Sequence, residues 1–144
     1  PPFSGDKLGI KYLEPYLAAY HLDVIVIQLG TNDLKRRFAL SVVDIANALE
    51  ALILDIKNYY RHRELPKIII LSPPAVYEVG AYKSIYAGAE LKAKRLVEEF
   101  KNVADSNNCC FVNCFELITP CSSEGVHWPS SQHKTLVDHL RSCL

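Results

Sequence analysis

The order of apolar segments along the chain constrains its fold more than any other feature. Three short apolar runs, at residues 23–29, 67–71 and 109–115, are separated by longer segments whose apolar residues recur at three- and four-residue steps. Runs that are apolar throughout are typical of parallel strands buried on both faces, and periodic segments are typical of amphipathic helices. This alternation predicts a single α/β domain over residues 1–144, with a parallel sheet and right-handed crossovers.

Two helices are predicted in the first half of the chain. Residues 10–20 predict a short helix, in which Pro15 must lie in the first turn or break the helix. Residues 41–62 predict a long helix, with Ser41 as its N-cap and Asp44 three residues later.

Two further helices are predicted in the second half. Residues 84–106 predict a long helix whose apolar face includes Leu91, and residues 129–142 predict a last helix whose apolar face includes Val137. Pro129 suits the first turn of that last helix, because a proline there lacks only an N–H that would have no partner.

Composition excludes several classes of function. The 16 basic and 16 acidic residues give zero formal net charge, which argues against nucleic-acid binding and against binding to an anionic membrane. No apolar run approaches the roughly 20 residues of a membrane span. The five cysteines form no CxxC pair, so we predict free thiols in a reducing cytosol, a cytoplasmic protein and no metal site; they are Cys109, Cys110, Cys114, Cys121 and Cys143.

Two motifs lie where a parallel sheet places its sites. The motif Gly-Thr-Asn-Asp, residues 30–33, directly follows the first strand, and Glu-Gly-Val-His, residues 124–127, directly precedes the last helix. Asn32, Ser72 and His127 all fall at or after the carboxyl ends of strands, where open α/β sheets bind their ligands. A side-chain amide donor and a histidine are two parts of an acyl-transfer site.

These residues resemble the SGNH (GDSL-like) hydrolase family. The family carries Gly-Thr-Asn-Asp-Leu-Lys after an apolar strand and an acidic-x-x-His motif before its last helix, and residues 30–38 are most similar to its arylesterase-type members. The resemblance covers residues 10–144. It implies a three-layer α/β/α, flavodoxin-like fold, a small carboxylic ester as substrate, and no metal or organic cofactor.

The resemblance also implies roles for individual residues. Asn32 would donate its amide to the oxyanion, and Gly30 would allow the close backbone approach before it. His127 would be the general base and then the general acid, and Glu124 would orient it, although the family normally has Asp at that position. Trp128 either lines the acyl pocket or packs under the last helix.

The nucleophile of the family has no clear counterpart. It is a Ser in a Gly-Asp-Ser turn after the first strand, and a Gly oxyanion donor follows it; the chain shows neither motif. Ser4, in the predicted loop 1–9, follows no apolar strand, and Ser72 is followed by two prolines. Ser122 and Ser123 are loop serines near His127. Whether this chain alone is an enzyme is therefore left open.

Without those first strands, residues 23–29 form an exposed sheet edge, which is an aggregation hazard. An upstream segment of the same gene product, a separate chain or a second copy could cover it; the first is favoured, and a homo-oligomer is also predicted.

The leading hypothesis is an SGNH-type serine esterase whose Ser lies outside this chain. The alternative is a noncatalytic domain that binds a partner or itself through its sheet edge. A flavodoxin-like phosphate binder is least favoured, because Asp33 stands where a phosphate loop needs glycines.

The sequence predicts that Arg36 and Arg37 form a solvated or inter-subunit surface. It leaves open whether three tyrosines line the site, contact another subunit or pack in the core: Tyr77, Tyr82 and Tyr86.

Overall fold

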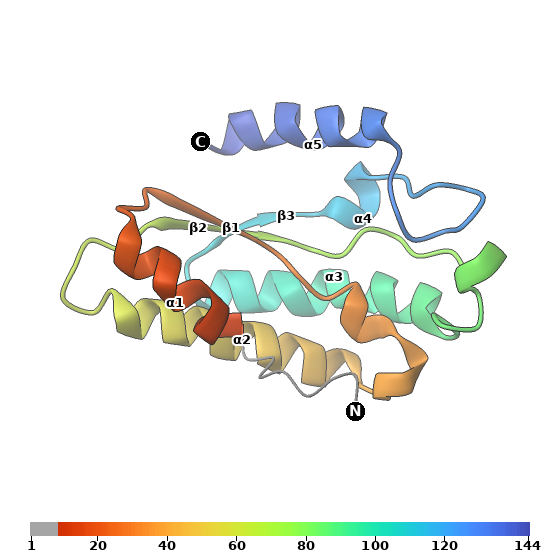
Figure 1. The fold of residues 1–144 in the computed structure, drawn as a ribbon, viewed down its shortest axis with the longest axis horizontal. Helices are drawn as coiled ribbons and strands as arrows, with labels where there is room; N and C mark the ends of the chain where they lie inside the picture. Colours follow the sequence, from red (N-terminus) through yellow and green to blue (C-terminus); the bar gives the residue numbers. More distant parts are fainter. Residues whose placement is uncertain (1–8) are drawn as a thin grey trace.

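The computed structural model describes residues 9–144, so Ser4 and most of the predicted loop 1–9 lie outside the described residues. Three parallel strands form one sheet in the order β1-β2-β3 (Figure 1). They are β1 (Val24–Gln28), β2 (Lys67–Leu71) and β3 (Cys110–Val112). In the register, Val24 lies beside Lys67, and Ile69 lies beside Cys110.

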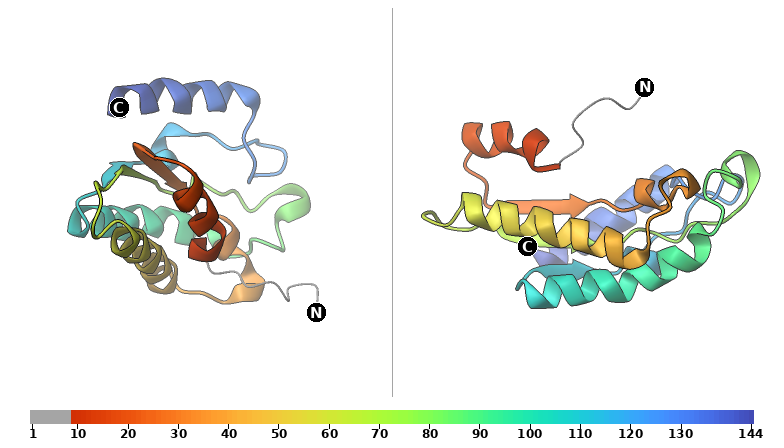
Figure 2. Two further views of the ribbon diagram at one scale, coloured as in Figure 1. Left: turned by 60° about the vertical axis from the view of Figure 1, so that its left-hand side comes forward. Right: turned by 90° about the horizontal axis from the view of Figure 1, so that it is seen from below.

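Helices cover the sheet on two sides (Figures 1 and 2). One side carries α2 (Val42–Tyr59) and α3 (Ala89–Ser106), with α1 (Gly9–Ala19) packed against α2. The opposite side carries α4 (Cys114–Leu117) and α5 (Ser130–Cys143). The predicted three-layer α/β/α architecture with a parallel sheet is confirmed. Within residues 9–144, no helix is long and apolar enough to cross a membrane.

The alternation of side chains along the strands divides the core in two. Ile25, Ile27, Ile68 and Ile70 pack against α2 and α3, in a cluster that also holds Phe100. On the other side of the sheet, a smaller cluster joins the sheet to α4 and α5; its buried members are Ile69, Leu71, Val112, Cys114, Ile118 and Leu136. The sheet is thereby fixed from both sides around β2.

The predicted start of the first long helix is confirmed. The Ser41 hydroxyl accepts a hydrogen bond from the Asp44 backbone N–H at 3.0 Å, and the Asp44 carboxylate accepts one from the Ser41 backbone N–H at 2.8 Å. This reciprocal capping box satisfies two N–H groups that the helix itself leaves unpaired.

Three predicted boundaries are wrong. Pro15 lies inside α1 rather than in its first turn, and the helix continues past it. The third strand ends at Val112, because the Asn113 side chain accepts a hydrogen bond from the Glu116 backbone N–H and begins α4. The second long helix begins at Ala89 rather than at residue 84, because the chain first turns through Gly88 at φ +84°.

Two predictions of helix faces are also wrong. Leu91 is 65% exposed and Val137 is 47% exposed, although both match the helical spacing of their segments. In each of these helices, the strip of side chains that packs against the core is narrower than the apolar pattern predicts. Pro129 precedes α5 as its N-cap rather than lying in its first turn.

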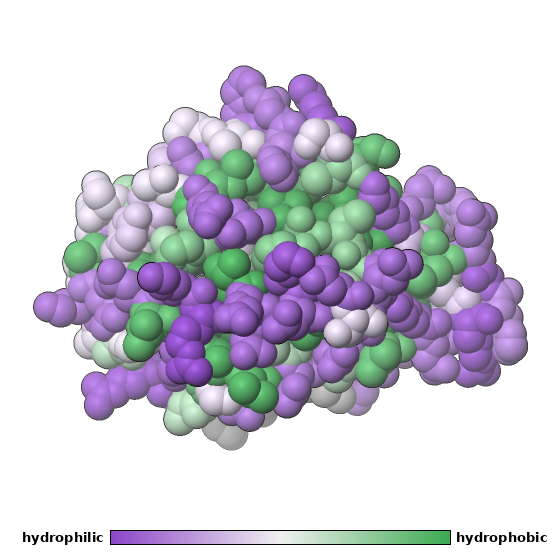
Figure 3. Space-filling view, turned by 180° about the vertical axis from the view of Figure 1, so that it is seen from behind, coloured by the Kyte–Doolittle hydropathy of each residue, from purple (hydrophilic) through white to green (hydrophobic). Residues whose placement is uncertain are grey.

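One side of β1 lacks cover within residues 9–144. At the edge of the sheet, β1 is hydrogen-bonded to β2 alone. Val26 in this strand is 45% exposed, and Leu29, directly after the strand, is 52% exposed. The strand is therefore buried on one face, not on both as predicted. A space-filling view from behind shows apolar side chains gathered near the middle of the back of the molecule, with polar side chains around them (Figure 3).

Candidate active site

The turn after β1 requires glycine at its first position. Gly30 has φ +112°, and a Cβ there would lie 2.8 Å from Pro73 Cγ and 3.1 Å from Phe100 Cζ. The tight turn leads into a 3₁₀ turn, η1 (Asn32–Leu34). It places the Asn32 side chain at the carboxyl end of the sheet, where the sequence predicts a site.

The loop that carries the histidine is tied to the loop after β2. Gly125 has φ +76°, its carbonyl accepts a hydrogen bond from the Tyr77 N–H at 2.8 Å, and a Cβ there would lie 2.1 Å from the Tyr77 carbonyl oxygen. The Cys121 N–H donates to the His127 carbonyl at 2.7 Å. These contacts hold His127 at the same end of the sheet as Asn32.

Glu124 binds His127 with both carboxylate oxygens. Oε2 lies 2.8 Å from His127 Nδ1, and Oε1 accepts the His127 backbone N–H at 2.5 Å. Burial alone would raise the pKa of Glu124, but the hydrogen bonds from the ring and backbone of His127 outweigh it and lower that pKa. The extra methylene of Glu, relative to the family's Asp, therefore does not prevent the contact with the ring.

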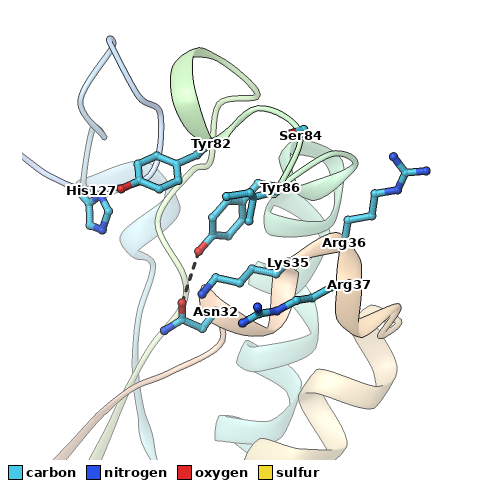
Figure 4. A pocket seen from close by; sticks show the side chains of 9 residues that line it. Asn32, Lys35, Arg36, Arg37, Tyr82, Ser84, Tyr86 and His127 are labelled. Atoms are coloured by element: carbon cyan, nitrogen blue, oxygen red, sulfur yellow. Dashed lines mark hydrogen bonds between the residues drawn. The ribbon is translucent and has the colours of Figure 1, made fainter. Parts of the chain in front are cut away.

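Tyr86 holds the side-chain amide of Asn32. The Tyr86 hydroxyl donates to Asn32 Oδ1 at 3.4 Å, which leaves the amide nitrogen pointing away from the tyrosine (Figure 4). Tyr86 is 3% exposed, and burial, followed by the charges of Tyr82 and Glu124, raises its pKa against the opposing effect of Arg37. The Tyr82 ring lies edge-on, 6.5 Å from the Tyr86 ring and 5.4 Å from the His127 ring.

Two adjoining cavities contain these side chains. The larger, about 700 Å³, is lined by Asn32, Lys35, Arg36, Arg37, Tyr82, Ser84, Ile85, Tyr86 and His127. The smaller, about 520 Å³, shares Asn32, Tyr86 and His127 and adds, among others, Gly30, Trp128 and His133. The Trp128 ring lies 5.1 Å from the His133 ring. The structure thus brings together Gly30, Asn32, His127 and Trp128, with Glu124 bound to His127.

The serines of the described chain do not complete a triad. Ser72 is fully buried, and its hydroxyl accepts the Cys114 backbone N–H at 2.9 Å. Ser123 Oγ lies 3.3 Å from Cys121 Sγ. Between residues 9 and 144, no serine or cysteine side chain hydrogen-bonds to the His127 ring. Burial also raises the pKa of the Cys114 thiol to about 11, which disfavours a thiolate nucleophile at neutral pH.

Sequence reasoning did not assign two contributions to the site. It left open whether Tyr86 lines the site, contacts another subunit or packs in the core, because Tyr86 lies 54 residues beyond Asn32 and no local pattern links them. Arg36 and Arg37 were predicted to form a solvated or inter-subunit surface, whereas they line the larger cavity together with Lys35, to which no role was assigned from the sequence. Their position directly after the Asn32 motif is the one signal that could have indicated this.

No protein-family model matches the chain, and no curated protein matches it in sequence. Solved structures do match it. A carbohydrate acetylesterase from Sinorhizobium meliloti has 24% identity and a TM-score of 0.82, covering 94% of this chain and 68% of its own. The aryl esterase of M. smegmatis has 26% identity and a TM-score of 0.81, with the same coverage. An acetyl-xylooligosaccharide esterase, a mutant of Axe2 from Geobacillus, has 19% identity and a TM-score of 0.65, covering 92% and 64%.

The fold and the resemblance of the motifs agree. The chain has the fold of the SGNH-type hydrolases, and its structural neighbours include arylesterases and carbohydrate acetylesterases. It spans about two thirds of the length of the solved structures that it matches.

Proposed function

We propose that this chain carries the histidine, its acidic partner and the oxyanion amide of a carboxylic-ester hydrolase. The observation that supports this most directly is the convergence of Asn32 and the Glu124-bound His127 on one cavity at the carboxyl end of the sheet. Arylesterases and carbohydrate acetylesterases of the same fold support the choice of esters as substrates.

The proposed reaction gives each of these groups one role. A serine hydroxyl attacks the ester carbonyl while its proton passes to His127 Nε2, and Glu124 holds the Nδ1–H side of the ring. Asn32, with its oxygen bound by Tyr86, donates from its amide nitrogen to the oxyanion of the tetrahedral intermediate. The intermediate collapses, His127 protonates the departing alcohol, and water then cleaves the acyl-enzyme by the same steps.

We further propose that the nucleophilic serine lies outside residues 9–144. A strand added beside β1 would bring a turn to the end of the sheet where Asn32 and His127 lie, and would cover the exposed Val26. The additional length of the structural neighbours is compatible with such a strand.

The test is hydrolysis of phenyl acetate by the purified protein beside His127→Ala and Asn32→Ala. His127→Ala should abolish activity above background, and Asn32→Ala should lower kcat about 10²–10³-fold, the usual loss of one oxyanion donor. His139→Ala, which changes an exposed ring on α5 that lines neither cavity, is the control. Activity above background that is the same in wild type and His127→Ala would refute the proposed role of His127. No activity in any of the proteins would support the noncatalytic alternative for this chain, and intact mass identifies any co-purifying piece that supplies the serine in an active preparation.

A second function is favoured by a different observation. The exposed side of β1 supports a noncatalytic domain that pairs with a partner or with a second copy through its sheet edge. This candidate predicts association without ester hydrolysis, so the same preparation distinguishes the two.

A further inference from the structure

In the part of the chain that the structure describes, the larger cavity is lined by three adjacent cations and by no carboxylate. Lys35, Arg36 and Arg37 follow the Asn32 motif and share the cavity with Asn32 and His127. The whole chain has 16 basic and 16 acidic residues, so this local excess of positive charge is not the consequence of a basic protein. It is a property of the site.

Two of these cations make no ion pair. Between residues 9 and 144, no carboxylate lies within 4.0 Å of the charged groups of Lys35 or Arg36. Lys35 is partly buried and extends toward Asn32, whereas Arg36 extends outward at the rim (Figure 4). Glu124, the carboxylate of the proposed triad, has both oxygens hydrogen-bonded to His127.

The backbone holds this basic turn in place. The Arg36 N–H donates to the Ile85 carbonyl at 2.9 Å, and the Phe38 N–H donates to the Lys35 carbonyl at 3.0 Å. Arg37 lies over the Phe38 ring, 4.8 Å from its centroid. Burial raises the pKa of Tyr86, and the charge of Arg37 offsets part of that rise. The backbone of this basic turn therefore has a fixed position relative to the tyrosine that binds Asn32.

We propose that the site prefers esters that carry a carboxylate elsewhere in the molecule, that Lys35 binds that carboxylate, and that Arg36 attracts it from the rim of the cavity. This inference rests on the proposed function and adds a substrate class to it. The ester carbonyl would face Asn32, and the carboxylate would lie on the side of the turn at residues 35–37. The charge of Lys35 acts on Asp33, but a cation with no carboxylate within 4.0 Å binds an anion without first breaking a close ion pair.

The experiment compares monomethyl succinate with dimethyl succinate at pH 7. Binding to the ¹⁵N-labelled full chain is followed through the Asn32 side-chain amide and the residue 35–37 backbone resonances, in 20 mM and in 300 mM NaCl. The variant Lys35→Gln/Arg36→Gln removes both cations. The matched control, Arg61→Gln/Arg63→Gln, removes the same charge just beyond the carboxyl end of α2.

We expect the monoester to bind more tightly than the diester, and the preference to shrink in high salt. The Lys35/Arg36 variant should weaken monoester binding by about two- to fivefold for each cation removed, while the control variant should bind as wild type does. Equal affinity for the two esters, or unchanged monoester binding in the Lys35/Arg36 variant, would overturn the inference.

Hydrolysis of the same two esters is measured separately. Charge-selective binding without hydrolysis would support the anion site and count against the enzymatic function. Hydrolysis of both esters with equal kcat/KM would support the function and overturn the substrate preference.

Discussion

At the scale of single residues, Tyr86 and Asn32 act as a pair. The Tyr86 hydroxyl donates a hydrogen bond to Asn32 Oδ1, and the burial of the Tyr86 ring fixes where that hydroxyl can lie. An amide whose oxygen is held presents its N–H₂ group in a defined direction. Tyr86 is therefore a positioning residue for the proposed oxyanion donor.

Removing the Tyr86 hydroxyl tests this positioning role. Tyr86→Phe keeps the ring packing but frees the amide, so the Asn32 side-chain NH₂ resonances should shift and broaden. In an active form, kcat should fall by about two- to tenfold with little change in KM, as expected for one neutral hydrogen bond. Tyr82→Phe is the control, because the Tyr82 hydroxyl makes no hydrogen bond within residues 9–144. Unchanged Asn32 resonances in Tyr86→Phe would exclude the role.

The glycine in the histidine loop offers a second test. Gly125→Ala adds a Cβ 2.1 Å from the Tyr77 carbonyl oxygen at φ +76°, so it should lower the free energy of unfolding by about 1–3 kcal/mol or more and displace His127. Gly88→Ala is the matched control, because Gly88 has φ +84° and nothing within 4 Å of an added Cβ. Urea unfolding of both variants separates the effect of the steric clash from that of the positive φ. Equal losses of unfolding free energy in the two variants would argue against the clash.

At the scale of elements, α2 is defined by its capping box. The hydrogen bond from the Ser41 hydroxyl, and then the one from the Ser41 backbone, lower the pKa of Asp44 from its ordinary 3.8. A carboxyl whose pKa is lower in the folded state stabilises the fold fully above pH 3.8, and this contribution is lost as pH falls through the lower folded-state value.

Asp44→Asn should therefore show a pH-dependent cost. The difference in unfolding free energy from wild type should be constant above about pH 5 and should shrink at lower pH, as Asp44 is protonated. Urea unfolding between pH 2.5 and pH 6 measures it. Asp55→Asn, at an exposed position further along α2, controls for the loss of one negative charge. A difference that stays constant down to pH 2.5 would contradict the hydrogen-bonded carboxylate.

At the scale of the whole molecule, the uncovered side of β1 makes association the main question. Val26 is 45% exposed in the middle of this edge strand, where a lysine discourages strand pairing. Val26→Lys should weaken any self-association by about tenfold or more, since each tenfold change corresponds to only about 1.4 kcal/mol. Sedimentation velocity measures the change.

Val43→Lys is the control for this prediction. Val43 is 50% exposed on α2, so Val43→Lys adds the same charge at a position of similar exposure that lies outside β1. Both variants should keep the circular dichroism of the wild type. Association that is identical in wild type and both variants would mean that β1 is not the contact.

The sequence alone determined the local part of this protein. The alternation of apolar runs with periodic segments predicts the parallel strands, and Ser41 with Asp44 predicts the start of α2, because these signals depend on residues a few positions apart. The same local logic places Asn32 and the Glu124–His127 pair at strand ends. It failed at Leu91 and Val137, since helical spacing does not reveal how wide the packed stripe is.

Only the tertiary structure decided which distant side chains meet. It brought Tyr86 to Asn32, placed the basic residues 35–37 around the cavity, and buried Ser72 against Cys114. It also left one side of β1 exposed within the described residues, although the apolar sequence of residues 23–29 predicts a strand buried on both faces. These outcomes depend on how β1, β2 and their loops converge, and a residue's spacing along the chain carries no information about a partner 54 positions away.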